Sequence, residues 1–292
     1  MELRVLHYFL TVAREENITK AAALLHITQP TLSRQIIQLE DELGVKLFTR
    51  GNHNIVLTEE GMLLKRRAQE LLSLADRTKQ EFIHNREEIS GEIVVGSGEF
   101  LSTSTFSDMV FRFHEKYPNV RYRIYSGNAD NIRDYIERGL LDFGIVMEPV
   151  DIRKYDCISF PTKERWGILV RDDSELAVLE QVKPSDLAGK KLIAGAGEAA
   201  QSGLYHWMRE YYDEDNILVF GNLLYNEAMM AKSGMGAVIC LKLKSVYEGL
   251  RFIPLFPPVE SGTALIWKKD QIFSPAVRAF LEHIRDYIQS YS

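Results

Sequence analysis

The chain has 292 residues, of which 46% are hydrophobic and 26% are charged, and this composition is typical of a folded protein with two or three hydrophobic cores. It contains no run of about 18 apolar residues and no signal-peptide core, so we expect a cytoplasmic protein without a transmembrane helix or a membrane partner. The net charge of -6 does not by itself favour nucleic-acid binding. Cys157 and Cys240 lie far apart and outside any CxxC spacing, which gives no expectation of a disulfide or a metal site.

Residues 18–25 predict a short alanine-rich helix, and a second helix begins near Gln29 after a short break. Two helices with apolar faces joined by so few residues must cross, which is the geometry of a helix-turn-helix. Thr28 can cap the second helix, and Pro30 in its first turn loses no hydrogen bond. The apolar residues of the second helix recur at helical spacing and should face the core: Ile36, Leu39 and Leu43.

The other face of the second helix is polar and is the candidate DNA-reading surface. Arg and Gln side chains can read base edges, whereas Ser and Thr suit phosphates and mixed contacts. The same face could be an ordinary solvated surface, and composition alone does not separate the two interpretations. Residues 1–58 hold six basic and six acidic residues, so DNA affinity must come from local placement. The candidate contacts on this helix are Thr28, Gln29, Pro30, Thr31, Ser33, Arg34 and Gln35.

A predicted hairpin favours the DNA-reading interpretation. Two short apolar runs, at 46–50 and 55–57, flank the turn residues 51–54 and together predict a wing. Arg50, His53 and Asn54 at its tip could approach a phosphate or the minor groove. We therefore predict a winged helix-turn-helix DNA-binding domain over residues 1–58.

Residues 2–61 resemble the winged helix-turn-helix of LysR-type transcriptional regulators. The resemblance rests on ELRVLHYFLTVA, AAALLHITQPTLSRQIIQLEDELGVKLFTR and VLTEEG. The chain departs from the family at Asn17-Ile18-Thr19, where relatives often carry Ser-Phe-Thr. The resemblance implies double-stranded promoter DNA, a small-molecule co-inducer without another cofactor, a homodimer or homotetramer, and contact with RNA polymerase.

Residues 59–90 predict a long helix, because residues 59–88 contain no proline and only one glycine. At ~1.5 Å per residue, about 30 residues give a rod of roughly 45 Å. We favour a dimerising linker helix, as the resemblance also implies, over a helix that packs on its own domain. The predicted heptad seam consists of Leu64, Ala68, Leu71, Ala75, Thr78, Phe82, Asn85 and Ile89.

Residues 91–292 alternate between apolar β-branched runs and helical segments, which predicts parallel strands with crossover helices. We expect a two-lobed α/β effector-binding domain with a hinged cleft, lobe I comprising 91–161 and 268–292 and lobe II comprising 162–267. The family's effector domain is similar to periplasmic binding proteins, in agreement with this division.

Ligands bind beyond the carboxyl ends of parallel strands, which locates candidate cleft residues. The first strand and the following helix start supply Ser97, Gly98, Glu99, Phe100, Ser102 and Thr103, and later strand ends supply Asn128 and Met147. The resemblance places effector contacts at Glu99, Phe100 and Asn128, and near Gly197.

Relatives often have Ser or Thr where this chain has Asn128 and Glu99. A carboxylate there would repel a dicarboxylate and would favour a cationic, zwitterionic or neutral effector. Alternatively, Glu99 caps the helix that follows it.

Two other classes of protein fit the sequence less well than a DNA-binding regulator. An enzyme with a DNA-binding appendage would need a catalytic base in the cleft. Of seven histidines, four lie in the head or linker and none of the others falls at a predicted strand end, so we expect no enzyme activity. A solute-sequestering protein would not need the predicted DNA-binding head.

Overall fold

The computed structural model describes residues 1–50, 55–82 and 89–290. The chain divides into two compact units, Met1–His84 and Asn85–Ser292, and each is described by itself.

Three helices form the core of the first unit: α1 (Leu3–Glu15), α2 (Ile18–Leu24) and α3 (Gln29–Leu43). The caps explain where the paired helices begin. The Asn17 side chain accepts a 2.9 Å bond from the backbone N–H of Lys20, and Thr28 Oγ1 accepts one of 3.4 Å from Thr31 N. The predicted helix pair is confirmed. The expected core position of Leu43 is wrong, because Leu43 is 39% exposed whereas Leu32 is fully buried.

The predicted wing is an antiparallel hairpin of β1 (Phe48–Arg50) and β2 (Ile55–Leu57), in which Phe48 pairs with Leu57. The tip residues His53 and Asn54 lie outside the described residues, and the side chain of Arg50 is not described.

Helix α4 (Glu59–Phe82) has 24 residues, and its N-terminal half packs on the unit's own core. Ala68 is fully buried in that core, and Leu64 and Leu72 pack against it. Leu64 and Ala68, two members of the predicted heptad seam, therefore pack inside their own protomer. Leu71 and Leu74 are each 40% exposed. The predicted seam residue Asn85 lies outside the described residues, and Ile89 packs against the core of lobe I instead of lying on a helix.

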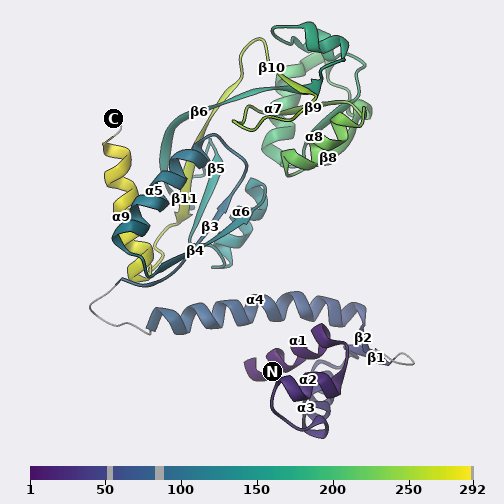
Figure 1. Cartoon of the computed structure of the whole chain (residues 1–292), viewed down its shortest axis with the longest axis vertical. Coiled ribbons are helices and arrows are strands. Elements are labelled where there is room, and N and C mark those ends of the chain that lie inside the picture. Colours follow the sequence, from purple (N-terminus) through teal and green to yellow (C-terminus); the bar gives the residue numbers. More distant parts are fainter. Residues whose placement is uncertain (51–54, 83–88, 291–292) are drawn as a thin grey trace. The chain divides into compact units, whose positions relative to one another are not determined.

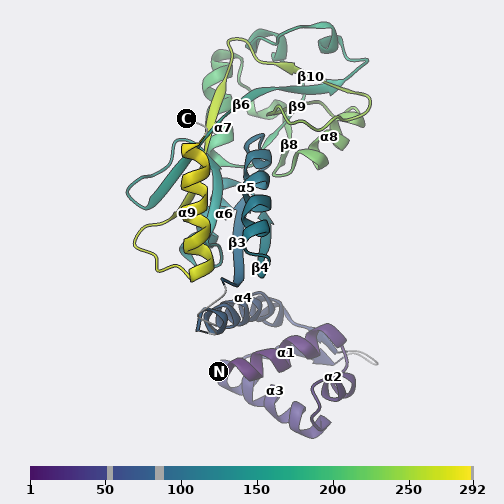
Figure 2. The same cartoon turned by 60° about the vertical axis from the view of Figure 1, so that its left-hand side comes forward.

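Lobe I of the second unit is a sheet covered on both faces (Figures 1 and 2). Strand β3 (Gly91–Ser97) runs parallel to β4 (Val120–Ser126) and β5 (Phe143–Met147). Helices α5 (Ser102–Lys116) and α9 (Pro275–Gln289) cover one face through an aromatic core that includes Phe113 and Phe280. Helix α6 (Ala129–Glu137) covers the other face.

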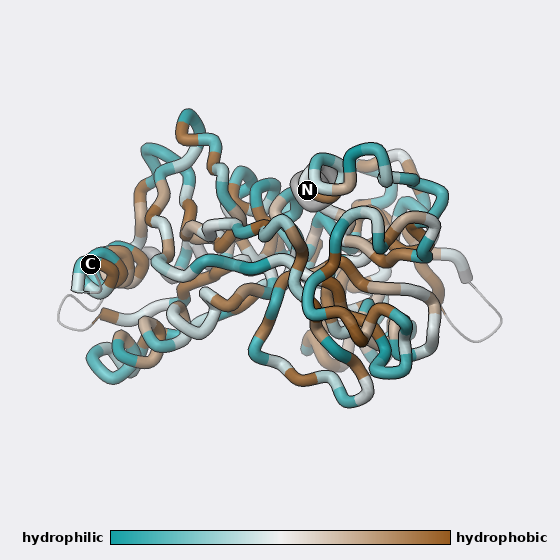
Figure 3. The backbone as a smooth tube through the Cα atoms, turned by 90° about the horizontal axis from the view of Figure 1, so that it is seen from above, coloured by the Kyte–Doolittle hydropathy of each residue, from teal (hydrophilic) through white to brown (hydrophobic). Residues whose placement is uncertain are grey.

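Lobe II continues the same sheet with β7 (Leu192–Gly195), β8 (Ile217–Gly221), β9 (Ala237–Leu241) and β10 (Leu250–Pro254). Helices α7 (Glu198–Met208) and α8 (Leu224–Lys232) pack on it. Short 3-10 helices at Glu175–Val178, Pro184–Leu187, Arg209–Tyr211 and Glu214–Asn216 complete the lobe. Hydrophobic and hydrophilic stretches alternate along the chain, and many of the outer turns are hydrophilic (Figure 3).

Two antiparallel strands join the lobes. Strand β6 (Tyr155–Arg171) runs through both, and β11 (Glu260–Lys268) pairs with it on either side of an irregularity between Gly262 and Ala264. The second crossing therefore lies near Gly262, and the predicted boundary at 268 is wrong. Residues 264–267 pair with β6 on the lobe I side and supply Leu265 and Trp267 to the core of lobe I.

Candidate DNA-binding surface and interlobe cleft

The polar face of α3 is exposed over the predicted contacts. Gln29, Pro30, Thr31 and Arg34 are exposed, and Ser33 and Gln35 are half-buried. Local bonds organise this face: Gln29 Nε2 donates to Ser33 Oγ at 2.8 Å, and Gln35 Nε2 donates to Gln38 Oε1 at 3.0 Å. Helix α3 therefore presents these polar groups outward while its apolar face stays anchored in the core.

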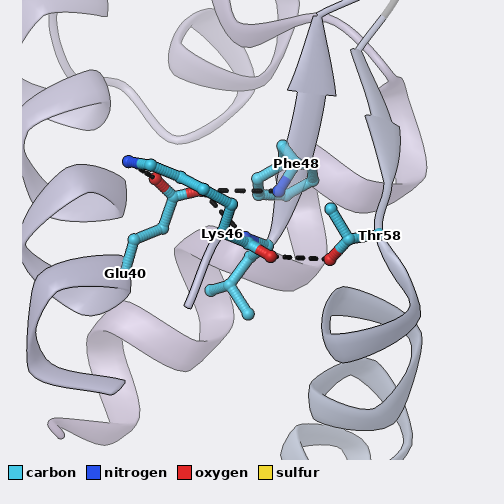
Figure 4. A network of polar contacts seen from close by, with 5 residues as sticks. Glu40, Lys46, Phe48 and Thr58 are labelled. Atoms are coloured by element: carbon cyan, nitrogen blue, oxygen red, sulfur yellow. Dashed lines mark hydrogen bonds and ion pairs between the residues drawn. The ribbon is translucent and has the colours of Figure 1, made fainter. Parts of the chain in front are cut away.

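A buried carboxylate fixes the wing to α3. Glu40, on the buried side of α3, accepts bonds from Lys46 Nζ at 2.6 Å, Leu47 N at 2.9 Å and Phe48 N at 3.4 Å (Figure 4). Burial works to raise the pKa of Glu40, but the bonds from Lys46, Leu47 and Phe48 outweigh it, and the pKa lies below its ordinary value. This role of Glu40 was not predicted, because its partners lie beyond the end of α3.

The start of α4 is held to the same segment. Thr58 Oγ1 donates to the Lys46 carbonyl at 2.7 Å and accepts from Gly61 N at 2.9 Å (Figure 4 shows the first of these bonds). A Cβ on Gly61 would lie 2.1 Å from the Leu47 carbonyl oxygen, so only glycine allows this close approach. Helix α3, strand β1 and helix α4 are thereby joined through the bonds of Glu40 and Thr58.

A cleft of about 150 Å³ lies between the two lobes. Six of the nine predicted effector residues line it: Gly98, Glu99, Phe100, Asn128, Met147 and Gly197. The other three, Ser97, Ser102 and Thr103, do not. The Ser97 hydroxyl donates to the Gly98 carbonyl at 2.7 Å, and Ser102 is fully buried. A contact between the six residues and an effector remains a prediction.

The cleft is acidic. Glu99, Asp130 and Glu227 line it, and no Lys, Arg or His does so in the described part of the chain. Glu227 is 6% exposed on α8, and burial together with repulsion from the Glu99 carboxylate raises the pKa of Glu227 to about 7. Asp130, in the first turn of α6, pairs with Arg133 at 3.5 Å.

Side chains of the protein itself bond to the N-termini of α5 and α6 beside the cleft. Glu164, fully buried on β6, accepts from Leu101 N at 2.8 Å and Ser102 N at 3.0 Å at the start of α5. Asn128 caps α6 through a 2.9 Å bond from Asn131 N. The backbone N–H groups at the start of α5 are therefore already bonded to a carboxylate of the protein itself.

Glu99 does not cap the helix that follows it, contrary to the alternative considered from the sequence. Its carboxylate accepts from the backbone N–H of Leu224, the first residue of α8 in the opposite lobe. The bond crosses the cleft, and it places a negative charge at the positive end of the α8 dipole.

Three acidic residues of the site were not predicted from the sequence: Glu227, Asp130 and Glu164. One signal for Glu227 was available, because it shares the helical spacing of the buried residues Leu224, Ala228 and Ala231. An acidic residue at an apolar position of a helix that follows a strand end is a candidate site residue. Glu164 offered no such signal, since its partners lie about 60 residues away.

The cysteines do not form a disulfide with each other. Cys157 is exposed on β6, Cys240 is buried on β9, and both are free thiols. Across the residues that the structure describes, no group of three or more His, Cys, Asp or Glu side chains could hold a metal ion. No helix within those ranges combines the length and apolar character needed to cross a membrane.

The comparisons with known proteins agree with this architecture. Residues 3–62 match the family described as bacterial regulatory helix-turn-helix protein, lysR family, and residues 86–289 match the LysR substrate binding domain. Two regulators from Bacillus subtilis are similar along nearly their whole length. YybE is 26% identical, with 97% of this chain and 98% of YybE covered, and YwbI is 29% identical, with 99% and 97% covered.

Among solved structures, full-length CbnR complexed with its target DNA matches with a TM-score of 0.74 at 20% identity, covering 98% of this chain and 100% of CbnR. The chain belongs to the LysR family of transcriptional regulators. It combines a helix-turn-helix DNA-binding head with an effector-binding domain.

Proposed function

We propose that this regulator responds to a positively charged effector that binds in the interlobe cleft. The observation that carries the proposal is the lining of the cleft, which combines three carboxylates with no cationic side chain among the described residues. The α5 and α8 N-termini, which could hold an anion, are already occupied by Glu164 and Glu99. An ammonium or amidinium group would relieve the repulsion between Glu99 and Glu227. At these two helix starts, the described N–H groups that could bind an anion are already bonded to carboxylates of the protein.

The mechanism follows from the bond that Glu99 makes across the cleft. Glu99 of lobe I holds the N-terminus of α8 in lobe II. A cation between Glu99 and Glu227 competes with Leu224 N–H for the Glu99 carboxylate. It thereby changes the relative stability of open and closed cleft geometries. Such a shift reaches the DNA only if the two geometries also differ in how the heads are held.

The test of the proposed effector class is a calorimetric titration of the full-length protein with matched compounds. Each carbon skeleton is offered as the ammonium, the carboxylate and the alcohol. We expect binding of ammonium compounds alone, and loss of that binding in Glu227→Gln. Glu180→Gln serves as the control, because Glu180 is exposed and lies outside the cleft lining. Tight binding of carboxylates or dicarboxylates would overturn the proposal.

For DNA, we propose that the α3 residues Gln29, Ser33 and Arg34 read the operator, with the wing beside them. Arg34 is exposed and forms no ion pair with any residue that the structure describes. Arg34→Ala should weaken specific DNA binding about tenfold or more, as loss of one bidentate base contact does. Arg251→Ala removes an exposed arginine from β10 and is the charge-matched control. A fluorescence-anisotropy titration in which both variants bind equally tightly would contradict the assignment.

We also propose that the protein works as a homo-oligomer, a dimer or a tetramer. Exposed apolar side chains on α4 (Leu71, Leu74) and on the sheet's edge strands β4 (Ile124) and β8 (Leu218, Phe220) support this. Sedimentation of a Leu71→Asp, Leu74→Asp variant should show a smaller assembly, and an unchanged assembly would remove α4 from the interface.

The remaining assignments are proposals of the same kind. The protein acts in the cytoplasm, contacts RNA polymerase at the promoter, needs no cofactor besides its effector, and has no enzyme activity of its own. A purified protein that turns over a bound metabolite would contradict the last of these.

A further inference from the structure

A second cavity, of about 350 Å³, lies beside the acidic cleft. It is bounded by the end of β5, the hinge strands β6 and β11, and helix α7 of lobe II. Its lining is largely apolar and aromatic: Trp166, Leu204, Trp207, Ile239, Leu255 and Val259. Ligand pockets typically measure about 300–1,000 Å³.

The two tryptophans present apolar rings to the cavity because their polar atoms are satisfied elsewhere. Trp166 Nε1 donates to Ser261 Oγ at 3.2 Å, and Trp207 Nε1 donates to the Pro257 carbonyl at 3.3 Å. Neither indole N–H needs a ligand or a water molecule as its acceptor. Beside the polar lining residues Glu148, His206 and Ser261, the pocket offers an occupant mainly apolar ring and aliphatic surface, which favours an aromatic or branched aliphatic group.

Met147, at the end of β5, lines both this aromatic pocket and the acidic cleft. Its side chain is unbranched and adapts readily to a neighbouring group. The cleft alone, at about 150 Å³, holds only a small head group. A ligand that reaches past Met147 gains the larger apolar space next to it.

We propose that the effector is an amphipathic cation, with its positive nitrogen between Glu99 and Glu227 and its aromatic or branched aliphatic group in the pocket of Trp166 and Trp207. This rests on the proposed cationic effector and adds the second half of the molecule. The acidic cleft selects the charge, and the aromatic pocket selects the size and shape of the apolar group.

Gly203 offers a way to fill the pocket without disturbing the fold. It lines the cavity from α7, and a Cβ at this position would meet no atom within 4 Å. Leucine is favoured over glycine within a helix, so Gly203→Leu should fold while its side chain occupies the pocket mouth. Gly203→Ala is the matched control, because it makes the same backbone change and adds only a methyl group.

The experiment titrates the full-length protein with ethylammonium, 2-phenylethylammonium and 2-phenylethanol, followed by calorimetry and tryptophan fluorescence. In the unmodified protein the phenyl ring should tighten ammonium binding about tenfold or more. Gly203→Leu should abolish this gain and leave ethylammonium binding unchanged, whereas Gly203→Ala should keep the gain.

The outcomes separate this inference from the proposed effector charge. Equal affinity for the two ammonium compounds, both dependent on Glu227, would overturn the aromatic pocket while the cationic effector stands. If 2-phenylethanol binds as tightly as 2-phenylethylammonium and Gly203→Leu weakens both, the pocket binds apolar groups but the cationic head group is overturned.

Discussion

Glu40 in the DNA-binding head and Glu227 in the effector cleft are buried to the same extent, with 7% and 6% of their surface exposed. Their pKa values nevertheless move in opposite directions. The pKa of Glu40 is lowered, whereas that of Glu227 is raised to about 7. The amount of burial therefore does not determine what a buried carboxylate does in this protein.

The difference lies in the partners. Glu40 accepts from one ammonium and two backbone N–H groups. Glu227 has no hydrogen-bond donor among the described residues and faces a second carboxylate, Glu99. A buried charge whose partners are supplied by the fold stabilises the fold. A buried charge without partners destabilises it and is retained where a ligand supplies the missing partner.

The largest expected effect is the dependence of stability on pH at Glu227. Its raised pKa means that the folded state binds the proton more tightly than the unfolded state. Stability from this group is therefore full below about pH 4.5, falls as the pH rises to about 7, and stays low above that value. A shift of this size corresponds to on the order of 3 kcal/mol.

Glu227→Gln should remove this dependence. Between pH 5 and pH 8, the difference in unfolding free energy between variant and unmodified protein should change by on the order of 3 kcal/mol. Tryptophan fluorescence is the readout, because Trp166, Trp207 and Trp267 all lie in the effector-binding unit. If the unfolding free energies of the two proteins change with pH in the same way, Glu227 does not differ from Glu40 as described.

The next largest effect is expected at Glu40 and has the opposite sign. Its lowered pKa contributes stability that is present above the unfolded pKa of about 4.5 and is lost as the pH falls. Glu40→Ala leaves the buried N–H of Leu47 unpaired and should cost about 2 kcal/mol at pH 7.

Hydrogen exchange of the Leu47 and Phe48 amides measures the Glu40 effect locally. Glu40→Gln keeps one acceptor and should lose less protection than Glu40→Ala. Unchanged exchange in both variants would show that the wing is held in another way.

The smallest effect is expected for Glu99→Gln, which keeps an acceptor for Leu224 N but removes the repulsion on Glu227. The pKa of Glu227 should fall toward its ordinary value, and stability at pH 8 should rise by about 1 kcal/mol. Titration of Glu227 by carbon-detected NMR in the two proteins tests this. A pKa that does not move would mean that burial alone sets it.

The local features of the fold could be predicted from the sequence, and the long-range ones could not. The α3 start at Gln29 and the wing follow from caps, turns and periodicity within a few residues. The lobe boundary was misplaced because residues 264–267 read as one more strand of lobe II, whereas their partners in β5 and β6 lie more than 100 residues earlier. The heptad from Leu64 remains a prediction as a dimer seam. Leu64 and Ala68 pack on the protomer's own core, and spacing along a helix does not reveal which surface a residue meets.

In the cleft, too, local features could be predicted and long-range contacts could not. Strand ends located Glu99, Asn128 and Met147, because ligand positions follow from topology. The bond from Glu99 to α8 and the placement of Glu164 at α5 depend on two lobes coming together. No pattern along the chain encodes that approach.

The most direct test of a cationic effector is a measurement of proton release on binding. At pH 7 Glu227 is about half protonated, and a cation beside it favours the ionised form. Calorimetric titration with 2-phenylethylammonium in buffers of different ionisation enthalpy should show release of about half a proton, and none in Glu227→Gln. Binding without proton release, or with uptake of a proton, would contradict the account.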